Sequence, residues 1–319
     1  MHRTEEQNEL AAILRTLLDK RSGSAAVREA AGSAAGHDED LWRTLCQEIG
    51  AAALDVPEEY DGAGASLAES LVVLEELGRS LTPSPLLASV IAVEALMGCD
   101  DEDARARLLP RIAAGEIATV AFGPTNVLHG TQAAIVLAVA GDELVEVDPS
   151  VARTATPALD ITLQLAGLDL GSATTRRIGG HEAVRRARDT ALVGSAALQL
   201  GGMQRALDDT VTYTSQRVQF GRTLGSFQAL KHRMADMLVR VEMSRSAVLA
   251  AAVHQTTEAA LVAASYCSES FEYVAAEMVQ LHGGIAITWE HDAHLVLKRA
   301  HALGTLWGRP HEHRALVAL

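Results

Sequence analysis

The chain has 319 residues, of which 48% are hydrophobic and 3% aromatic, so it is long enough for two or three domains and too apolar for a disordered protein. Its formal net charge of −14 would repel phosphates, and we therefore expect no nucleic-acid partner. The N-terminal stretch is polar and no apolar run reaches about 18 residues, which predicts a cytoplasmic protein without a membrane span. Three widely spaced cysteines favour buried thiols in a reducing compartment: Cys46, Cys99 and Cys267.

Residues 1–117 are predicted to form an N-terminal helical domain. In the stretch EEQNELAAILRTLLDK, leucine and isoleucine recur at helical spacing. The stretch DEDLWRTLCQEIG begins with acidic residues and ends at Gly50, which is typical of a helix. A Pro- and Gly-rich loop, VPEEYDGAGAS, precedes another amphipathic helix that closes near Gly78. We expect Pro110 to split the last segment of this region into two helices.

The middle of the chain, residues 118–187, changes character. Runs such as AAIVLAVAG and ELVEVDPS are separated by turn residues, which predicts a short middle β-domain. Residues 188–319 return to helical patterns and predict a C-terminal domain of four long helices, with small residues around Gly194 and Gly201 that allow close packing. The predicted fold class is mainly α with a small β-domain.

A glycine-broken, basic corner, RVQFGRTLGSFQ, joins the first two of these long helices. Taken alone, Arg217 would cap a helix and the glycines would end helices. The order of the domains, however, together with three stretches, resembles the acyl-CoA dehydrogenase family over almost the whole chain. The stretches are VPEEYDGAGASLAESLVVLEELGR, RVQFGRTLGSFQALKHRMADM and VQLHGGIAITWEHDAHLVLKRA.

The resemblance implies that this corner contacts FAD that belongs to a neighbouring subunit. By that likeness Arg217 neutralises the flavin pyrophosphate, Phe220 lies by the adenine, and Gln228 is a nearby polar contact. A diphosphate needs a fixed cation and close backbone N–H donors, and glycine permits that approach. The full set of implied cofactor-binding residues is Arg217, Gln219, Phe220, Gln228, Gln280, Gly283 and Gly284.

The resemblance also implies a reaction for which this chain lacks the base. In the family a glutamate removes the α-proton of an acyl-CoA thioester while the flavin receives hydride. Trp307 stands in the slot of that glutamate, so no catalytic residue is assigned, and Glu258 and Glu242 are the alternatives for a displaced base. The slot of the family's substrate-facing arginine falls at Leu192, several residues after the basic cluster of Arg185, Arg186 and Arg188.

Two further features complete the sequence-based expectations. The spacing of His291 and His294 offers no third ligand, so no metal site is expected, and the terminal histidines of the stretch HEHR, His311 and His313, are expected to lie in a solvated end of the chain. The β-domain is shorter than the family's, and AFGPTNVLHG occupies the place of its flavin-ring loop.

The chain therefore resembles the short, base-lacking subunit of actinobacterial α2β2 enzymes that act on CoA thioesters of steroid side chains. A second subunit would then carry the glutamate, and an electron-transfer flavoprotein would accept the electrons. The alternatives are a self-sufficient homo-oligomeric enzyme with a displaced base, and a flavin-free scaffold of the same fold.

Overall fold

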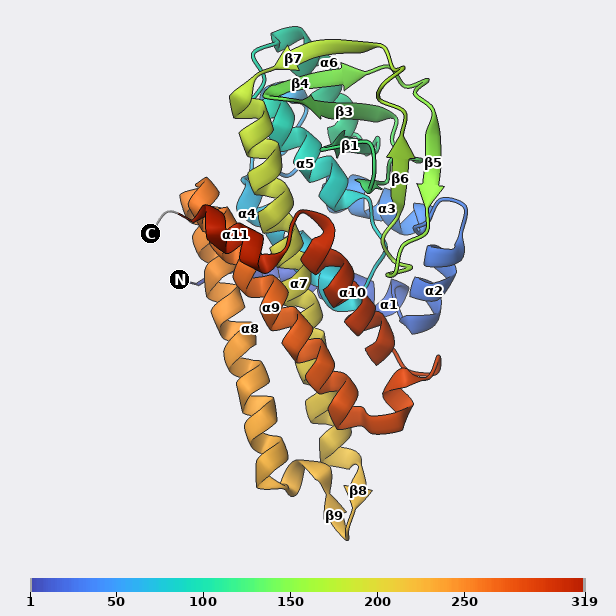
Figure 1. Ribbon diagram of the computed structural model, residues 1–319, viewed down its shortest axis with the longest axis vertical. Coiled ribbons are helices and arrows are strands. Elements are labelled where there is room, and N and C mark those ends of the chain that lie inside the picture. Colours follow the sequence, from blue (N-terminus) through green and yellow to red (C-terminus); the bar gives the residue numbers. More distant parts are fainter. Residues whose placement is uncertain (1, 318–319) are drawn as a thin grey trace.

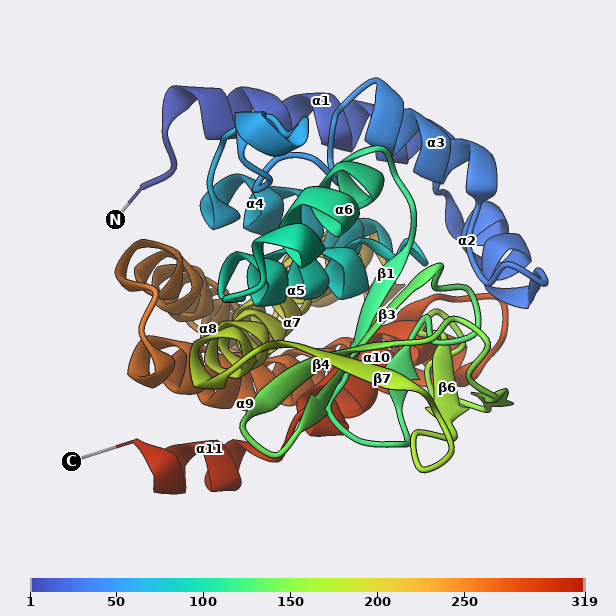
Figure 2. The ribbon, with the colours of Figure 1, turned by 90° about the horizontal axis from the view of Figure 1, so that it is seen from above.

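The computed structural model describes residues 2–317 and confirms the predicted fold class, mainly helical with a small β-region. Figure 1 shows the sheet at one end of an elongated molecule and a small hairpin at the other, with the long helix α7 running between them. Seen from above, α1 to α3 follow one side of the molecule and α11 the opposite side (Figure 2). Within residues 2–317, no helix combines the length and the apolar character that crossing a bilayer requires.

The N-terminal region consists of short and medium helices that begin at clear capping signals. Thr4 and Gln7 form a capping box at the start of the first helix, and Ser66 and Glu69 form another. The elements are α1 (Glu5–Arg21), α2 (Ser24–Gly32), α3 (Glu39–Gln47), the 3-10 turn η1 (Glu58–Tyr60), α4 (Leu67–Ser80), α5 (Leu86–Met97) and α6 (Glu102–Ala113).

The expected split at Pro110 is wrong, because α6 runs through this proline as one helix. A proline inside a helix removes one backbone hydrogen bond and costs about 3 kcal/mol. The cost is offset because Leu108, Leu109 and Ile112 are buried on the core side of the same helix.

The β-region has two small sheets. In the first the strand order is β1-β3-β4-β7, with β1 parallel to β3 and the other pairs antiparallel; in the second it is β2-β6-β5. Their strands are β1 (Ala118–Ala121), β2 (Val127–Leu128), β3 (Ile135–Ala140), β4 (Glu143–Val147), β5 (Arg153–Thr156), β6 (Leu165–Leu168) and β7 (Thr175–Gly179).

The C-terminal region is built around α7, which packs against α4, α5 and α9. A Cβ atom at Gly201 would lie 1.9 Å from the carbonyl oxygen of Glu75, so the predicted small residues do bring two helix backbones into contact. The elements are α7 (His181–Gln216), β8 (Val218–Gln219), β9 (Arg222–Thr223), η2 (Leu224–Ser226), α8 (Gln228–His254), α9 (Thr257–His282), η3 (Gly283–Ile287), α10 (Ala293–Leu306) and α11 (Pro310–Leu316).

Two details of this region differ from the sequence-based expectation. Helix α7 begins at His181, not near residue 188, because strand β7 ends at Gly179 and Gly180 caps the helix. The basic first turns are compatible with a helix because Arg185 pairs with Glu182 and Asp189. The terminal HEHR stretch, expected to be a solvated end, forms part of α11 and buries His313.

Candidate functional site

The corner between α7 and α8 is a tight and ordered structure. Arg217 follows the last turn of α7, and its backbone N–H donates to the carbonyl of Tyr213 at 2.9 Å. The N–H of Leu224 donates to the carbonyl of Arg217 at 2.8 Å and closes the loop. The corner therefore fixes the backbone at Arg217 while its side chain stays exposed.

A two-residue β-hairpin forms the tip of this corner. Gln219 pairs with Arg222, which leaves Phe220 and Gly221 as the turn, both with positive φ, 55° and 78°. This is the backbone of the turns that favour Asn-Gly or Gly-Gly, and a phenylalanine in it is strained. Its side chain is 91% exposed. The fold thus holds an aromatic ring out in solvent at a cost in backbone strain.

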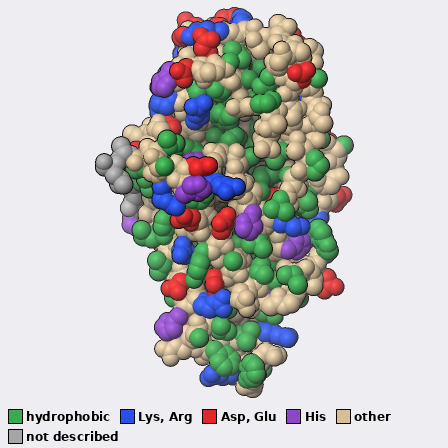
Figure 3. Space-filling view, in the orientation of Figure 1, with side chains coloured by type: hydrophobic (Ala, Val, Ile, Leu, Met, Phe, Trp, Pro, Cys, Tyr) green, Lys and Arg blue, Asp and Glu red, His purple; other side chains and the backbone are tan. Residues whose placement is uncertain are grey.

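Other side chains of the corner shape its surface. The guanidinium of Arg222 lies over the ring of Phe227, just before α8, with its central carbon 3.8 Å from the ring centroid. The ring of Phe220 meets Phe227 edge-on, with centroids 6.3 Å apart. Gln228 begins α8 and is exposed, as is Gln219. Figure 3 shows apolar and Lys or Arg side chains gathered at the end of the molecule formed by this hairpin.

A second loop lies near the same end of the molecule. Helix α9 ends at His282, and Gly283 follows with φ 67°. The Tyr213 hydroxyl donates to the His282 carbonyl at 3.3 Å, and the two rings stack with centroids 4.4 Å apart. Since Tyr213 lies one helical turn before Arg217, this contact ties the loop to the corner.

The predicted glycines of the second loop leave its backbone accessible. A Cβ atom added at Gly283 or at Gly284 would meet nothing within 4 Å, and the same holds at Gly221 in the hairpin. Gln280 is exposed one turn before the loop. The structure therefore places all seven sequence-predicted cofactor residues at exposed positions on two neighbouring loops or in the helices next to them.

A different arrangement surrounds Trp307, which ends α10. Its indole N–H donates to the Ser195 hydroxyl of α7 at 2.8 Å. Its ring meets Phe122 edge-on, with centroids 5.1 Å apart. Phe122 follows strand β1 in the stretch AFGPTNVLHG. The sequence shows an aromatic residue in that stretch, but no local pattern predicts that it contacts Trp307.

Beside these two rings lies a pocket of about 760 Å³ between the N-terminal halves of α7 and α9 and helix α11. Arg185 and Arg188 line it together with Leu192, whereas Arg186 does not and pairs with Glu94 of α5. Its lining residues are Phe122, Asp142, His181, Val184, Arg185, Arg188, Asp189, Ala191, Leu192, Thr257, Leu261, Leu306, Trp307, His313 and Leu316.

Neither alternative base is part of this pocket. Glu258 is exposed in the first turn of α9. Glu242 is exposed on α8 and pairs with Arg245 at 3.5 Å. The carboxylates that do line the pocket are Asp142 and Asp189. Burial raises the pKa of Asp189, although Thr257 and Arg185 both donate to its Oδ2 atom.

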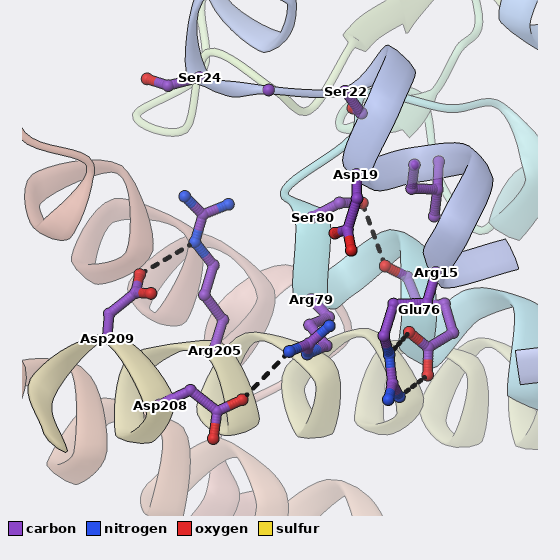
Figure 4. A pocket seen from close by; sticks show the side chains of 12 residues that line it. Arg15, Asp19, Ser22, Ser24, Glu76, Arg79, Ser80, Arg205, Asp208 and Asp209 are labelled. Carbon is purple, nitrogen blue, oxygen red and sulfur yellow. Dashed lines mark hydrogen bonds and ion pairs between the residues drawn. The ribbon is translucent and has the colours of Figure 1, made fainter. Parts of the chain in front are cut away.

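A second pocket, of about 230 Å³, is lined by charged residues from α1, α4 and α7 (Figure 4). Its three arginines are already paired: Arg15 with Glu76 at 2.7 Å, Arg79 with Asp208 at 3.2 Å, and Arg205 with Asp209 at 3.3 Å. The first two pairs join α4 to α1 and to α7, the third lies within α7, and together they leave little charge to bind a ligand. We therefore assign this pocket a structural role.

The histidines of the second loop pack against one another. The His282 and His291 rings lie 4.6 Å apart, and the N–H of Ala293 donates to Nδ1 of His291 at 3.0 Å. Within residues 2–317 no group of three or more His, Cys, Asp or Glu side chains has the geometry of a metal site.

Comparison with known proteins gives the family. Family profiles described as acyl-CoA dehydrogenase, N-terminal domain, and acyl-CoA dehydrogenase, C-terminal domain, match residues 4–116 and 179–318. Acyl-CoA dehydrogenase IpdE2 of Mycolicibacterium smegmatis is 44% identical, over 97% of this chain and 96% of its own. This chain belongs to the acyl-CoA dehydrogenase family. IpdE2 of Mycobacterium tuberculosis is 43% identical over 97% of this chain and 95% of its own.

Two solved structures superpose on the chain with a TM-score of 0.90 each. One is described as the Tcur3481–Tcur3483 steroid ACAD, in a variant form, and is 27% identical. The other is the ChsE4–ChsE5 complex from Mycobacterium tuberculosis, at 26% identity. In each case the match covers 98% of this chain and 96% of the other.

Members of the acyl-CoA dehydrogenase family are FAD-dependent, and the side chains on the two loops are of the kinds that suit the adenine and pyrophosphate end of FAD. Arg217 is exposed and has no ion-pair partner within the described part of the chain. Three glycines leave accessible backbone near it, and Phe220 offers a bare aromatic face. A diphosphate and a purine are ligands that such groups recognise.

The environment of Trp307 does not fit a flavin ring. Trp307 and Phe122, which the sequence resemblance predicts to stand in the slot of the base and in place of the flavin-ring loop, contact each other. No planar ring can insert between them, and the indole N–H is already bonded to Ser195. A tryptophan also cannot accept a proton from a substrate. The exposed groups at the α7–α8 corner therefore suit a diphosphate and a purine, whereas the paired rings of Trp307 and Phe122 leave no room for a flavin between them.

Proposed function

We propose that this chain is one subunit of an FAD-dependent acyl-CoA dehydrogenase whose second subunit carries the catalytic glutamate and the flavin-ring pocket. The observation that carries the proposal is the contrast between its two half-sites. Trp307 packs against Phe122 where, by the family resemblance, a base and a flavin would have to meet. Arg217 and Phe220, in contrast, are exposed, and Arg217 has no ion-pair partner within residues 2–317.

The residues of this chain would act on the cofactor and not on the substrate. Arg217 would neutralise the pyrophosphate, with backbone N–H groups near Gly221 and Gly284 as further donors. Phe220 would cover the adenine, and Gln228 and Gln280 would hydrogen-bond to the same end of the cofactor. FAD, when bound, supplies the acceptor for the hydride that leaves the β-carbon of the acyl thioester. The α-proton passes to the glutamate of the second subunit.

The finer parts of the proposal rest on likeness to relatives. The neighbouring structure described as a steroid ACAD supports a CoA thioester of a steroid-derived acid as the substrate. The ChsE4–ChsE5 structure is described as a complex of two proteins, which supports a hetero-oligomer of the α2β2 kind. We propose an electron-transfer flavoprotein as the electron acceptor and the cytoplasm as the location, by the family resemblance.

A co-expression experiment tests the subunit proposal. The chain is produced alone and together with a complete acyl-CoA dehydrogenase subunit from the same genome, and mass and flavin per chain are measured. We expect little flavin on the lone chain and a yellow tetramer with the partner, in which there is one FAD for every two chains. A lone yellow homotetramer with one FAD on every chain would refute the half-site interpretation.

A self-sufficient homo-oligomer is the second candidate, and one observation bears on where its base would lie. Asp189 lines the pocket beside Trp307 and burial raises its pKa, whereas neither Glu258 nor Glu242 lines that pocket. Replacing Asp189 by Asn would abolish turnover of the lone chain if this candidate held. Equal activity of the Asp189→Asn variant would exclude Asp189 as a base. A chain that binds no FAD with or without a partner would instead favour a scaffold.

A further inference from the structure

The loop of residues 283–291, between α9 and α10, carries the accessible backbone of Gly283–Gly284, and its position depends mainly on contacts at its two ends. At the first end, the Tyr213 hydroxyl donates to the His282 carbonyl and the two rings stack. The whole loop lies in the described part of the chain, and within it only Ala286 is buried. What holds the second end therefore matters for where the glycines lie.

Asp292, the N-cap of α10, anchors the second end of the loop to two other helices. Its Oδ1 atom accepts hydrogen bonds from the Ser24 hydroxyl at 2.6 Å and from Nη2 of Arg28 at 2.8 Å, both on α2. Its Oδ2 atom accepts from Nη2 of Arg205 on α7 at 2.8 Å. Burial would raise the pKa of Asp292, but the Ser24 hydroxyl and the two arginines outweigh it and hold the pKa below its usual value. A charged carboxylate therefore joins the loop to α2 and α7.

The same arginine of α2 contacts the loop at a second point. The guanidinium carbon of Arg28 lies 5.7 Å from the centroid of the Trp289 ring. Nζ of Lys298, on α10, lies 4.8 Å from that centroid. Arg28 therefore ties both the loop and the residue that follows it to α2, a helix that carries none of the predicted cofactor residues.

We infer that Asp292 is a positioning residue for the cofactor site, which fixes the loop where the backbone N–H groups near Gly283–Gly284 can reach the cofactor. The inference rests on the proposed function, in which this loop and Arg217 hold the same end of FAD. Asp292 itself contacts no cofactor and performs no chemistry. A loop without its carboxylate would populate other positions, and the apparent affinity for FAD falls with the fraction of molecules whose loop is correctly placed.

Asp292→Asn tests the inference because it keeps the shape of the side chain and removes its charge. FAD is an anion, so the loss of a carboxylate would by electrostatics alone leave FAD binding unchanged or strengthen it. We expect the opposite: a dissociation constant at least about tenfold higher, as for a loop that is correctly placed in about one molecule in ten. The measurement is calorimetric titration of FAD into the flavin-free complex of the full chain with its partner subunit.

Asp209→Asn is the matched control. Asp209 is the other carboxylate that pairs with Arg205, at 3.3 Å, and it lies on α7 and not on the loop (Figure 4). The control removes the same charge and leaves Asp292 in place, so FAD affinity should change by less than about twofold.

Hydrogen exchange of the flavin-free complex gives a second readout, which needs no FAD. Backbone amides of residues 283–291 should exchange faster in Asp292→Asn than in the wild type, because the loop opens more often. They should exchange at the wild-type rate in Asp209→Asn.

Arg28→Gln gives a milder second variant, because Ser24 and Arg205 still hold the carboxylate. It should also weaken FAD binding. Since Arg28→Gln and Asp292→Asn remove the same contact, the double variant should bind FAD within about twofold of Asp292→Asn alone. Fully additive losses would show that the two residues act separately and would contradict the inference.

The inference also fails if Asp292→Asn keeps its FAD affinity, if its loop amides exchange at the wild-type rate, or if Asp209→Asn has the same effects. Arg217→Ala is titrated alongside these variants. If it weakens FAD binding while Asp292→Asn does not, this inference fails and the proposed function stands. A wild-type complex that binds no FAD would refute the proposed function, and this inference with it.

Discussion

Replacing Phe220 by Asn should change the stability of the free chain and its affinity for FAD in opposite directions. Phe220 sits in the turn of the hairpin with φ 55°, a conformation that costs an ordinary residue roughly 1–2 kcal/mol. Asn followed by Gly221 is a preferred pair for this turn. Because the phenyl ring is 91% exposed, almost no buried contact is lost. The flavin-free chain should therefore become more stable, by about 1 kcal/mol.

FAD binding should weaken in the same variant. If the phenyl ring is fully covered when the adenine lies on it, its burial contributes about 1.5–3 kcal/mol. Asn cannot replace that apolar contact, so the dissociation constant should rise about 10- to 100-fold. Urea unfolding of the flavin-free chain gives the first quantity, and calorimetric titration of the apo-complex with FAD gives the second.

The control for this experiment lies on the same hairpin. Val218 is 55% exposed but outside the turn, so Val218→Ala should change both quantities by only a few tenths of a kcal/mol. If Phe220→Asn leaves FAD affinity unchanged, the ring does not contact the cofactor. If the variant is less stable without FAD, the strain assigned to this turn is wrong.

Three further predictions concern single side chains. Arg217→Ala should weaken FAD binding by about 1.5–3 kcal/mol, read as flavin content and affinity, with no loss of stability in the flavin-free chain. Trp307→Glu should yield no dehydrogenase activity by itself, since Phe122 still blocks the flavin ring, and should lower the unfolding free energy by about 2 kcal/mol. Burial raises the pKa of Asp55 from 3.8 to about 8. Between these two pH values the folded chain keeps a proton that the unfolded chain has released. The free energy of unfolding should therefore fall as the pH rises through this range, by up to about 1.4 kcal/mol per pH unit. Asp55→Asn should flatten this dependence in urea midpoints measured at pH 6 and pH 8, and an unchanged slope would contradict the assignment.

The fold was predictable where local signals and burial agree. The capping box at Ser66 and the glycines that bring α4 and α7 together are visible in the sequence, and both operate in the structure. The prediction failed at Pro110 and His313, where burial against the rest of the chain outweighs a local preference. The start of α7 at His181 was also missed, because a charged and basic stretch gives little helical periodicity.

The candidate site was predictable in part, and the division follows from how each half is built. Arg217, Phe220 and the Gly283–Gly284 pair lie within continuous stretches that resemble the family, so their positions could be taken from the sequence. The contact of Trp307 with Phe122 and Ser195 joins segments more than a hundred residues apart. No local pattern carries such a contact. Asp189 was missed for the same reason, since its raised pKa depends on burial by neighbouring helices.

The residues of the two proposed half-sites also differ in whether they stabilise the lone chain. Trp307 and Phe122 close one site by mutual contact and the bond to Ser195, which are gains available to the lone chain. Phe220 and Arg217 offer the lone chain no comparable gain, because the first is strained and exposed and the second has no ion-pair partner in the described part of the chain. Trp307 and Phe122 therefore stabilise this fold with or without a partner. Phe220 and Arg217 contribute favourable free energy only when a group outside the chain binds to them. The proposed group is the FAD of a second subunit.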